Sequence, residues 1–314
     1  MKKGSKQHGR VGGLKPQKQL TLRDLHQEFI MDCKVRGLSA QTITSYTNQY
    51  KYFTNFLHDE TAVRETTEQT VKEYIVHLMD RGITKSTTIN SYLQDLSPML
   101  KYAIRKGYIL RNIDIPFVHG QTTLKEIYSQ EELKALLEKP VSEDFLSLRV
   151  YAIVWVLAST GVRARELRNL KNENVDFINR VITLNETKNK SPRQVPISKA
   201  LYHVLMGYMA VRGGEGQEYL FPTIYNEMMA MTSLQTAVKG YCNSKGVYKT
   251  SLHLFRHTFI TNAVNQGVSP LILQRITGHQ TMAQLNRYYN SRVEDIVEVI
   301  DQIAPATNNR KRLL

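Results

Sequence analysis

Apolar residues recur at helical spacing along most of the chain, and this period changes at one place. Two short β-branched runs, at 181–184 and 194–197, flank a basic tip and predict a β-hairpin. In the first third of the chain, glycine or polar breaks separate four predicted helices: Thr21 to the break at Gly37, Ser39 or Thr42 to Leu57, Thr70–Met79 and Ser86–Arg105. The expected fold class is mainly α with a small β-sheet, in which an N-terminal helical bundle precedes an α+β domain.

The length of 314 residues exceeds what one hydrophobic core normally serves, so two domains are expected. Capping signatures at Thr21-x-x-Asp24 and Ser129-x-x-Glu132 mark where each domain begins. Between them, Pro116 and Gly120 disfavour a continuous helix. The expected division is a flexible basic arm at 1–18, a helical bundle at 19–112, a linker at 113–127, a second domain at 128–290, and a final helix with a basic tail at 291–314.

The net charge of +14 indicates a polyanionic partner, and residues 1–18 alone carry six basic residues and no acid. Basic tails that only solvate the chain or approach a membrane surface are the alternative. No apolar run reaches the roughly 18 residues of a membrane span, and the N-terminus lacks the apolar core of a secretory signal. Cys33 and Cys242 fit no metal spacing, so we expect reduced thiols and a cytoplasmic location, with no membrane partner.

Two islands of sequence can meet an anion. In Thr-Gly-Val-Arg-Ala-Arg-Glu-Leu at 160–167, a glycine turn feeds a helix and can aim Arg163 and backbone N–H groups at a phosphate. The alternative is an ordinary surface pair of Arg163 with Glu166. Lys188, at the hairpin tip, can serve as a proton donor or point charge, although most turn lysines are simply solvated.

A third island, His-Leu-Phe-Arg-His-Thr at 253–258, places His253 and Arg256 on one helical face. An imidazole beside a guanidinium suits a phosphodiester, because one group shuttles protons while the other stabilises charge. A zinc site is not expected there. No acid lies between His253 and His257, and Arg256 would repel a cation.

The fourth island is Gly278-His279 followed by Tyr288 and Tyr289. A tyrosine is a poor nucleophile near neutral pH because its ordinary pKa is about 10. It becomes useful when neighbouring arginines stabilise a phosphate and its developing charge. The alternative is that the Tyr-Tyr pair only packs against the core.

The order Arg–Lys–His-x-x-Arg–His–Tyr resembles the catalytic set of the tyrosine recombinases, the family of phage-type integrases and chromosome-dimer resolvases. Five phrases carry the resemblance: Thr-Gly-x-Arg-x-x-Glu-Leu, the lysine-tipped hairpin ending in Val-Pro-Ile, His-x-x-Arg-His, Gly-His, and a tyrosine nine residues further on. They span 128–290, and the helical 19–112 segment resembles the family's SAM-like core-binding domain in size and helix count.

The resemblance implies a site built from Arg163, Lys188, His253, Arg256, His279 and Tyr288. The two arginines would clamp the scissile phosphate, and Lys188 would protonate the departing 5′-oxygen. His253 would act as acid and base, while His279 would hydrogen-bond a phosphate oxygen. Tyr288 would form a 3′-phosphotyrosine, which retains the bond energy, so neither a metal nor a cofactor is expected. Glu166 would orient Arg163 or its helix.

The resemblance also implies a site-specific recombinase that closes as a C-shaped clamp on double-stranded DNA with inverted-repeat core sites. It would act as a homotetramer on two duplexes and be a monomer or weak oligomer when free. Accessory DNA-binding proteins are further candidate partners, and the expected location is cytoplasmic and nucleoid-associated, for a protein of bacterial or phage origin. The apolar pattern at 293–300 predicts a helix that packs either on a neighbouring subunit or on its own core.

Two positions depart from the family pattern. Thr277 stands before Gly278 where leucine is common, and Gln-Leu-Asn-Arg at 284–287 stands where a Thr-Thr pair usually precedes the tyrosine. Some integrases space their tyrosine at ten residues, which would select Tyr289 instead of Tyr288. A type IB topoisomerase-like nicking-closing enzyme is the alternative with the same chemistry. A DNA-binding protein without the reaction would not need the tyrosine, and a metal-dependent nuclease would need an acidic cluster.

Overall fold

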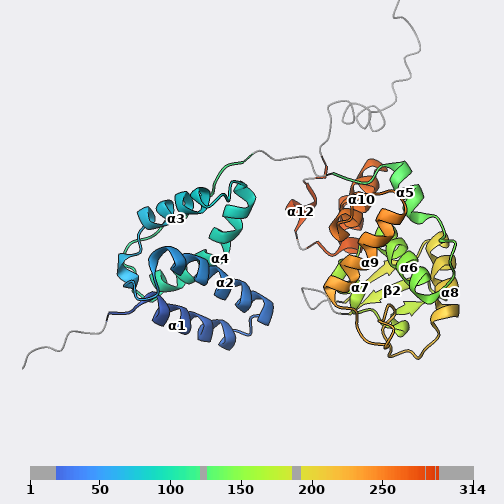
Figure 1. Cartoon of the computed structure of the whole chain (residues 1–314), viewed down its shortest axis with the longest axis horizontal. Coiled ribbons are helices and arrows are strands. Elements are labelled where there is room, and N and C mark those ends of the chain that lie inside the picture. Colours follow the sequence, from blue (N-terminus) through green and yellow to red (C-terminus); the bar gives the residue numbers. More distant parts are fainter. Residues whose placement is uncertain (1–18, 121–125, 186–191, 280, 287, 290–314) are drawn as a thin grey trace, which may run out of the picture. The chain divides into compact units, whose positions relative to one another are not determined.

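The computed structural model describes residues 19–120, 126–185, 192–279, 281–286 and 288–289. It divides the chain into two compact units, Met1–Thr123 and Leu124–Leu314 (Figure 1). Within the described residues, no helix is long and apolar enough to cross a membrane. The described elements are mostly helical with one small sheet, which confirms the predicted fold class.

In residues 19–120, the first unit is a bundle of four α-helices and one 3-10 turn: α1 (Leu22–Val35), α2 (Ala40–Leu57), η1 (Val63–Glu65), α3 (Glu68–Asp80) and α4 (Ser86–Arg105). Side chains cap three of the α-helix starts. Thr21 forms the expected capping box with Asp24, and Ser39 rather than Thr42 caps α2. Thr67, which the sequence analysis did not identify, caps α3. The α4 bounds agree with the prediction, whereas α3 extends beyond Thr70–Met79 at both ends.

The start of the expected linker is packed on the first unit. Ile113 is buried in its core, and Ile115 and Val118 pack against it. The side-chain amide of Asn90 donates to the carbonyl of Val118 at 2.9 Å, and its oxygen accepts from the Val118 N–H at 2.8 Å. The chain therefore stays attached to this unit as far as Val118.

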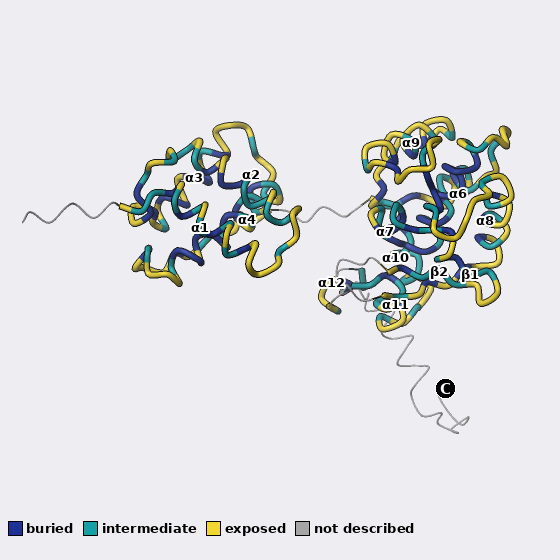
Figure 2. Tube along the Cα trace, turned by 90° about the horizontal axis from the view of Figure 1, so that it is seen from below, coloured by how far each residue is buried: buried dark blue, intermediate teal, exposed yellow. Residues whose placement is uncertain are grey.

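The second unit is built around one buried helix. Its elements are α5 (Gln130–Leu137), α6 (Phe145–Thr160), α7 (Ala164–Arg168), η2 (Asn172–Asn174), β1 (Val175–Asp176), β2 (Val181–Leu184), β3 (Arg193–Pro196), α8 (Lys199–Arg212), α9 (Met231–Ser244), α10 (Leu252–Asn265), α11 (Pro270–Thr277) and α12 (Met282–Asn286). Because α6 is apolar on all sides, it packs against α5, α8, α9 and α10. Most of its length is buried (Figure 2).

The predicted hairpin forms the antiparallel pair β2–β3, with Leu184 opposite Arg193, and β1 adds a short edge strand that the sequence did not predict. Ile182, Leu184 and Val195 are buried on one face of the sheet. The tip of the hairpin, which carries Lys188, lies outside the described residues. Residues 291–314, with the predicted final helix, also lie outside them.

Candidate active site

A glycine turn positions the first predicted arginine. Gly161 ends α6 in the left-handed conformation, with φ of 60°, and a Cβ built on it would approach the Phe259 ring to 2.5 Å. Glycine is therefore required for both its backbone conformation and the close approach. Two residues later, Arg163 occupies the N-cap of α7 with extended backbone, so its side chain leaves the chain where α6 and α7 meet.

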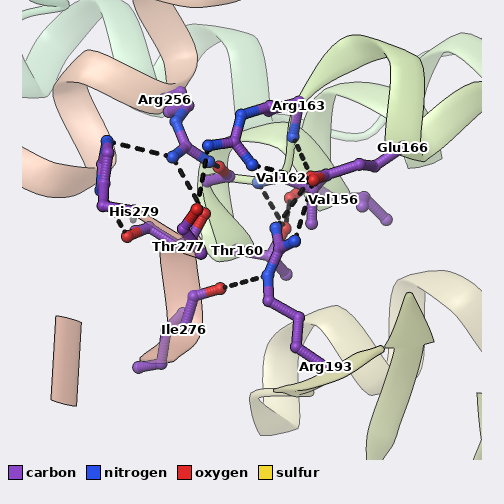
Figure 3. Close-up of polar contacts among 12 residues, drawn as sticks. Val156, Thr160, Val162, Arg163, Glu166, Arg193, Arg256, Ile276, Thr277 and His279 are labelled. Atoms are coloured by element: carbon purple, nitrogen blue, oxygen red, sulfur yellow. Dashed lines mark hydrogen bonds and ion pairs between the residues drawn. The ribbon is translucent and has the colours of Figure 1, made fainter. Parts of the chain in front are cut away.

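Glu166 lies between two arginines (Figure 3). Its Oε1 accepts from Nη1 of Arg163 at 3.0 Å and from Nη1 of Arg193 at 2.8 Å. Its Oε2 accepts from the backbone N–H of Arg163 at 2.9 Å and from Nη2 of Arg193 at 2.8 Å. Only 3% of the Glu166 side chain is exposed, so this carboxylate is a buried junction rather than half of a surface pair.

The pKa of Glu166 follows from two opposing effects. Burial raises it, but the hydrogen bonds from Arg193 and from the backbone of Arg163, together with both guanidinium charges, outweigh burial and hold the pKa below its usual value. The carboxylate is therefore ionised near neutral pH. It hydrogen-bonds both the side chain and the backbone N–H of Arg163, the residue three positions earlier.

Three arginines meet at the C-terminal end of α11 (Figure 3). The consecutive carbonyls of Ile276, Thr277 and Gly278 accept, respectively, from Nε of Arg193 at 3.0 Å, from Nη2 of Arg256 at 2.9 Å and from Nη2 of Arg163 at 3.0 Å. Carbonyls at the end of a helix lack partners within the helix and carry the negative end of its dipole. This end of α11 therefore stabilises three positive charges close together.

Arg256 is the most deeply held of the predicted residues. Its Nη1 donates to the carbonyl of Gly161 at 2.6 Å, and the residue is 7% exposed. Burial, followed by the charge of Arg163, lowers its pKa to about 10, so the guanidinium stays protonated near neutral pH. The side chain of Arg163 is 28% exposed, compared with 11% for Arg193, which leaves Arg163 as the arginine more open to a ligand.

The contacts of His279 determine which of its ring nitrogens carries the proton. The hydroxyl of Thr277 donates to the carbonyl of Leu273 at 2.6 Å, so its oxygen is left to accept from Nδ1–H of His279 at 2.7 Å. Nε2 of the same ring then accepts from Nη2 of Arg256 at 3.2 Å. The neutral Nδ1–H tautomer satisfies both contacts.

The two candidate tyrosines have different partners. The Tyr288 hydroxyl is hydrogen-bonded to Nδ1 of His257. The Tyr289 hydroxyl donates to the carbonyl of Val268 at 2.8 Å, and burial raises its pKa. Both rings also pack against a small apolar cluster formed by Ile260, Leu273 and Leu285, so core packing and an interaction of the Tyr288 hydroxyl occur together. Tyr288 also lies near enough to Arg256 for its ionised form to raise the pKa of that guanidinium.

The described residues bring together three of the six predicted site residues, namely Arg163, Arg256 and His279. Tyr288 joins through its interactions with His257 and Arg256, and Lys188 lies outside the described residues. His253 is exposed, and no described hydrogen bond joins it to Arg256, because that guanidinium is anchored on the carbonyls of Gly161 and Thr277. The imidazole beside Arg256 is therefore that of His279.

Sequence reasoning missed Arg193 and gave His257 no role. Arg193 follows the hairpin tip, and its partners lie 27 and 83 residues away, so no local pattern indicates it. His257 was visible in the phrase His-x-x-Arg-His, but its contact with Tyr288 spans 31 residues. Across the described ranges, no group of three or more His, Cys, Asp or Glu could hold a metal ion.

Comparison with known proteins gives the same division. Residues 126–295 match the phage integrase family, and residues 21–116 match the phage integrase SAM-like domain. The tyrosine recombinase XerC of Syntrophus aciditrophicus is 25% identical over 306 residues, covering 90% of this chain and 97% of the relative.

Two solved structures share the fold. The Tn1549 transposon integrase in complex with transposon right end DNA matches with a TM-score of 0.77 and 21% identity, covering 90% of this chain and 99% of that one. A lambda integrase tetramer bound to a Holliday junction matches with a TM-score of 0.67 and 15% identity, covering 86% and 77% of the two chains.

The buried junction at Glu166 predicts a pH-dependent stability. The folded-state pKa lies below the unfolded value of about 4.3, so the stabilisation is complete above that value and is lost as the pH falls through the folded pKa. Glu166→Gln should lower the free energy of unfolding by about 2 kcal/mol at pH 7, because charged hydrogen bonds are lost. In urea titrations this difference should shrink below about pH 4.

Glu143→Gln is the matched control, because that carboxylate is 65% exposed and pairs with Lys139 at the surface. It should change the free energy of unfolding by less than about 1 kcal/mol. A Glu166→Gln difference that is equally large at pH 7 and pH 3 would contradict the assigned charge of Glu166.

The tautomer of His279 predicts a spectroscopic effect of Thr277→Val. The substitution keeps the shape of the side chain but removes the oxygen that accepts from Nδ1–H. The ¹⁵N shifts of the imidazole should therefore move from the Nδ1–H pattern toward the Nε2–H pattern. Thr160→Val is the control, because Thr160 is equally buried and also donates to the carbonyl four residues earlier, without a histidine contact. Unchanged His279 shifts in Thr277→Val would refute the assignment.

Proposed function

The chain belongs to the phage integrase family, the tyrosine recombinases that cleave and rejoin DNA, and we propose that it does so through a covalent 3′-phosphotyrosine on Tyr288. The observation that carries this proposal is the arginine cluster at the end of α11. Three guanidiniums and one carboxylate leave two net positive charges, with Arg163 partly open to solvent. A buried site of this charge favours a phosphodiester, and favours the additional negative charge of its pentavalent transition state still more.

Arg163 and Arg256 would bind the non-bridging oxygens of the scissile phosphate. Each can donate two parallel N–H groups to a phosphate, which a lysine cannot do. His279 would hydrogen-bond a phosphate oxygen next to Arg256, its present neighbour at 3.2 Å. The contacts with backbone carbonyls keep the cluster assembled before DNA arrives, so little reorganisation is needed at the moment of reaction.

Tyr288 is favoured over Tyr289 by the partners of the two hydroxyls. The Tyr289 hydroxyl donates to the carbonyl of Val268, whereas the Tyr288 hydroxyl is hydrogen-bonded to an imidazole and lies near enough to Arg256 for its ionised form to be stabilised by that guanidinium. In the reaction, the Tyr288 oxygen would bond to phosphorus as the bond to the 5′-oxygen breaks, and the phenolic proton would pass to a base. Lys188 would give a proton to the leaving 5′-oxygen, and His253, which is exposed, would assist as acid and base.

Rejoining would be the same step in reverse, with a 5′-hydroxyl attacking the phosphotyrosine. Because the ester retains the bond energy, no nucleotide hydrolysis is needed and we propose no metal or cofactor. The net charge of +14 supports double-stranded DNA with inverted-repeat core sites as the partner, with affinity falling steeply as salt rises. The SAM-like domain match at 21–116 favours recombination over nicking and closing, since the chain then has two DNA-binding units to clamp one site.

Replacing the nucleophile tests the proposal. Tyr288→Phe should abolish covalent protein–DNA adducts while leaving binding nearly unchanged, because only a hydroxyl is lost. The assay uses a nicked duplex, carrying a site selected from a randomised pool by binding, with adducts resolved on denaturing gels. Tyr289→Phe is the matched control and should still form adducts. Adducts formed by Tyr288→Phe but not by Tyr289→Phe would assign the reaction to the other tyrosine.

We also propose that the protein assembles as a homotetramer on two duplexes and that residues 291–314 link neighbouring protomers. Deleting 291–314 should lower cooperative assembly on paired sites more than it lowers binding of one protomer to a half-site. Gel-shift titrations on half-site and full-site duplexes measure both quantities. Equal losses on the two duplexes would argue against a linking role for this segment.

A further inference from the structure

We propose that Arg193 is a positioning residue for strand cleavage, which neutralises Glu166 so that Arg163 remains available to the scissile phosphate. This inference rests on the proposed function and adds a residue to it. Arg193 lies at the start of β3 and does not belong to the set predicted from the sequence. Its side chain is 11% exposed, so it acts from beneath the site rather than on the DNA itself.

Arg193 makes three hydrogen bonds, one from each nitrogen of its guanidinium. Nη1 and Nη2 each donate to one oxygen of Glu166 at 2.8 Å, and Nε donates to the carbonyl of Ile276 at 3.0 Å. A planar fork can make a bidentate pair with a carboxylate and still hold a third acceptor, which an ammonium group cannot do with the same geometry. One side chain therefore joins the sheet, the start of α7 and the end of α11.

The two arginines make different numbers of side-chain hydrogen bonds to Glu166. Arg193 makes the bidentate side-chain pair, whereas Arg163 contributes one side-chain nitrogen and its backbone N–H. Arg163 can then direct its Nη2 to the carbonyl of Gly278 and keep part of its surface exposed. Without Arg193, Arg163 would be the only guanidinium among the described contacts of this buried carboxylate. Pairing would then draw Arg163 away from a phosphate.

The charge of the cluster changes in the same direction. Arg163, Arg193 and Arg256 with Glu166 give three positive charges and one negative charge, a net of +2. Replacing Arg193 by a neutral residue leaves +1, whereas replacing both Arg193 and Glu166 by neutral residues restores +2. Charge balance therefore separates the proposed role from a role in packing alone.

Gly278 keeps the space that Arg193 needs. It adopts φ of 66°, and a Cβ built on it would lie 2.9 Å from Nη1 of Arg193. The guanidinium thus lies against the backbone of the turn that leads to His279. The same turn supplies carbonyls to all three arginines, so a displaced Arg193 would also disturb the neighbours of His279.

The test compares four full-length variants with the wild type: Arg193→Met, Arg193→Lys, the double variant Arg193→Met/Glu166→Gln, and Arg212→Met. Arg212 is the matched control, because its side chain is 6% exposed and pairs with Glu218 at 2.9 Å in the same unit, outside the arginine cluster. Adduct formation is measured on the nicked duplex carrying the selected site. A second duplex carries a neutral methylphosphonate at the scissile position, and thermal unfolding is recorded for each protein.

Arg193→Met should cleave the phosphodiester at least about 10-fold more slowly than the wild type, since one preorganised charge is lost. The double variant should recover most of that loss. The cleavage rate of Arg193→Lys should lie between those of Arg193→Met and the wild type, and Arg212→Met should cleave at the wild-type rate. On the methylphosphonate, which lacks the charged oxygen, the gap between the wild type and Arg193→Met should narrow. A packing role would leave that gap the same on both substrates.

Two results would overturn the role of Arg193 without affecting the proposed function. One is that Arg193→Met forms adducts as fast as the wild type, and the other is that the double variant cleaves no faster than Arg193→Met. If Arg193→Met fails to fold, the cleavage rate of the double variant tests the proposal instead. Cleavage within about 10-fold of the wild type supports the proposal, and no cleavage by a folded double variant overturns it. A wild-type protein that binds the duplex but forms no adduct would instead overturn the proposed function, and this inference with it.

Discussion

The convergence of three guanidiniums on the last carbonyls of α11 is the interaction on which the site depends. The positive charges of neighbouring guanidiniums repel one another, and burial adds a desolvation penalty that lowers the pKa of Arg256. Two features offset these costs: the negative end of the α11 dipole, with its unpaired carbonyls, and the ionised carboxylate of Glu166. The protein thus holds three guanidiniums and one carboxylate together at the end of one helix.

The surrounding fold makes this convergence possible. Gly161 ends α6 close to the Phe259 ring. The chain then enters α7, which has Arg163 at its N-cap and Glu166 in its first turn. Gly278 ends α11 close to Arg193, and the next residue, His279, is hydrogen-bonded to Arg256. The strand register brings Arg193 to the same point from the sheet. Because each arginine comes from a different element, a shift of any one element would unpair buried donors or acceptors.

The sequence predicted what depends on local pattern. The capping boxes at Thr21 and Ser129, the extent of α4 and the hairpin strands follow from residue spacing alone, and the structure contains them. Arg163 and Arg256 were identified by their phrases. The bidentate pair of Arg193 with Glu166 and the contact of His257 with Tyr288 depend on tertiary packing, so no periodicity indicates them. The spacing of His253 and Arg256 predicted that they share a helical face. In the structure, the Arg256 guanidinium instead donates to the carbonyls of Gly161 and Thr277.

The central claim is that this cluster receives a scissile phosphate and that the phenol beside it becomes esterified. Trapping the protein on a nicked duplex, digesting it and mapping the nucleotide-modified peptide by mass spectrometry tests this most directly. We expect a phosphodiester adduct on the oxygen of Tyr288. An adduct on another side chain, or bound DNA that is never covalently attached under trapping conditions, would contradict it.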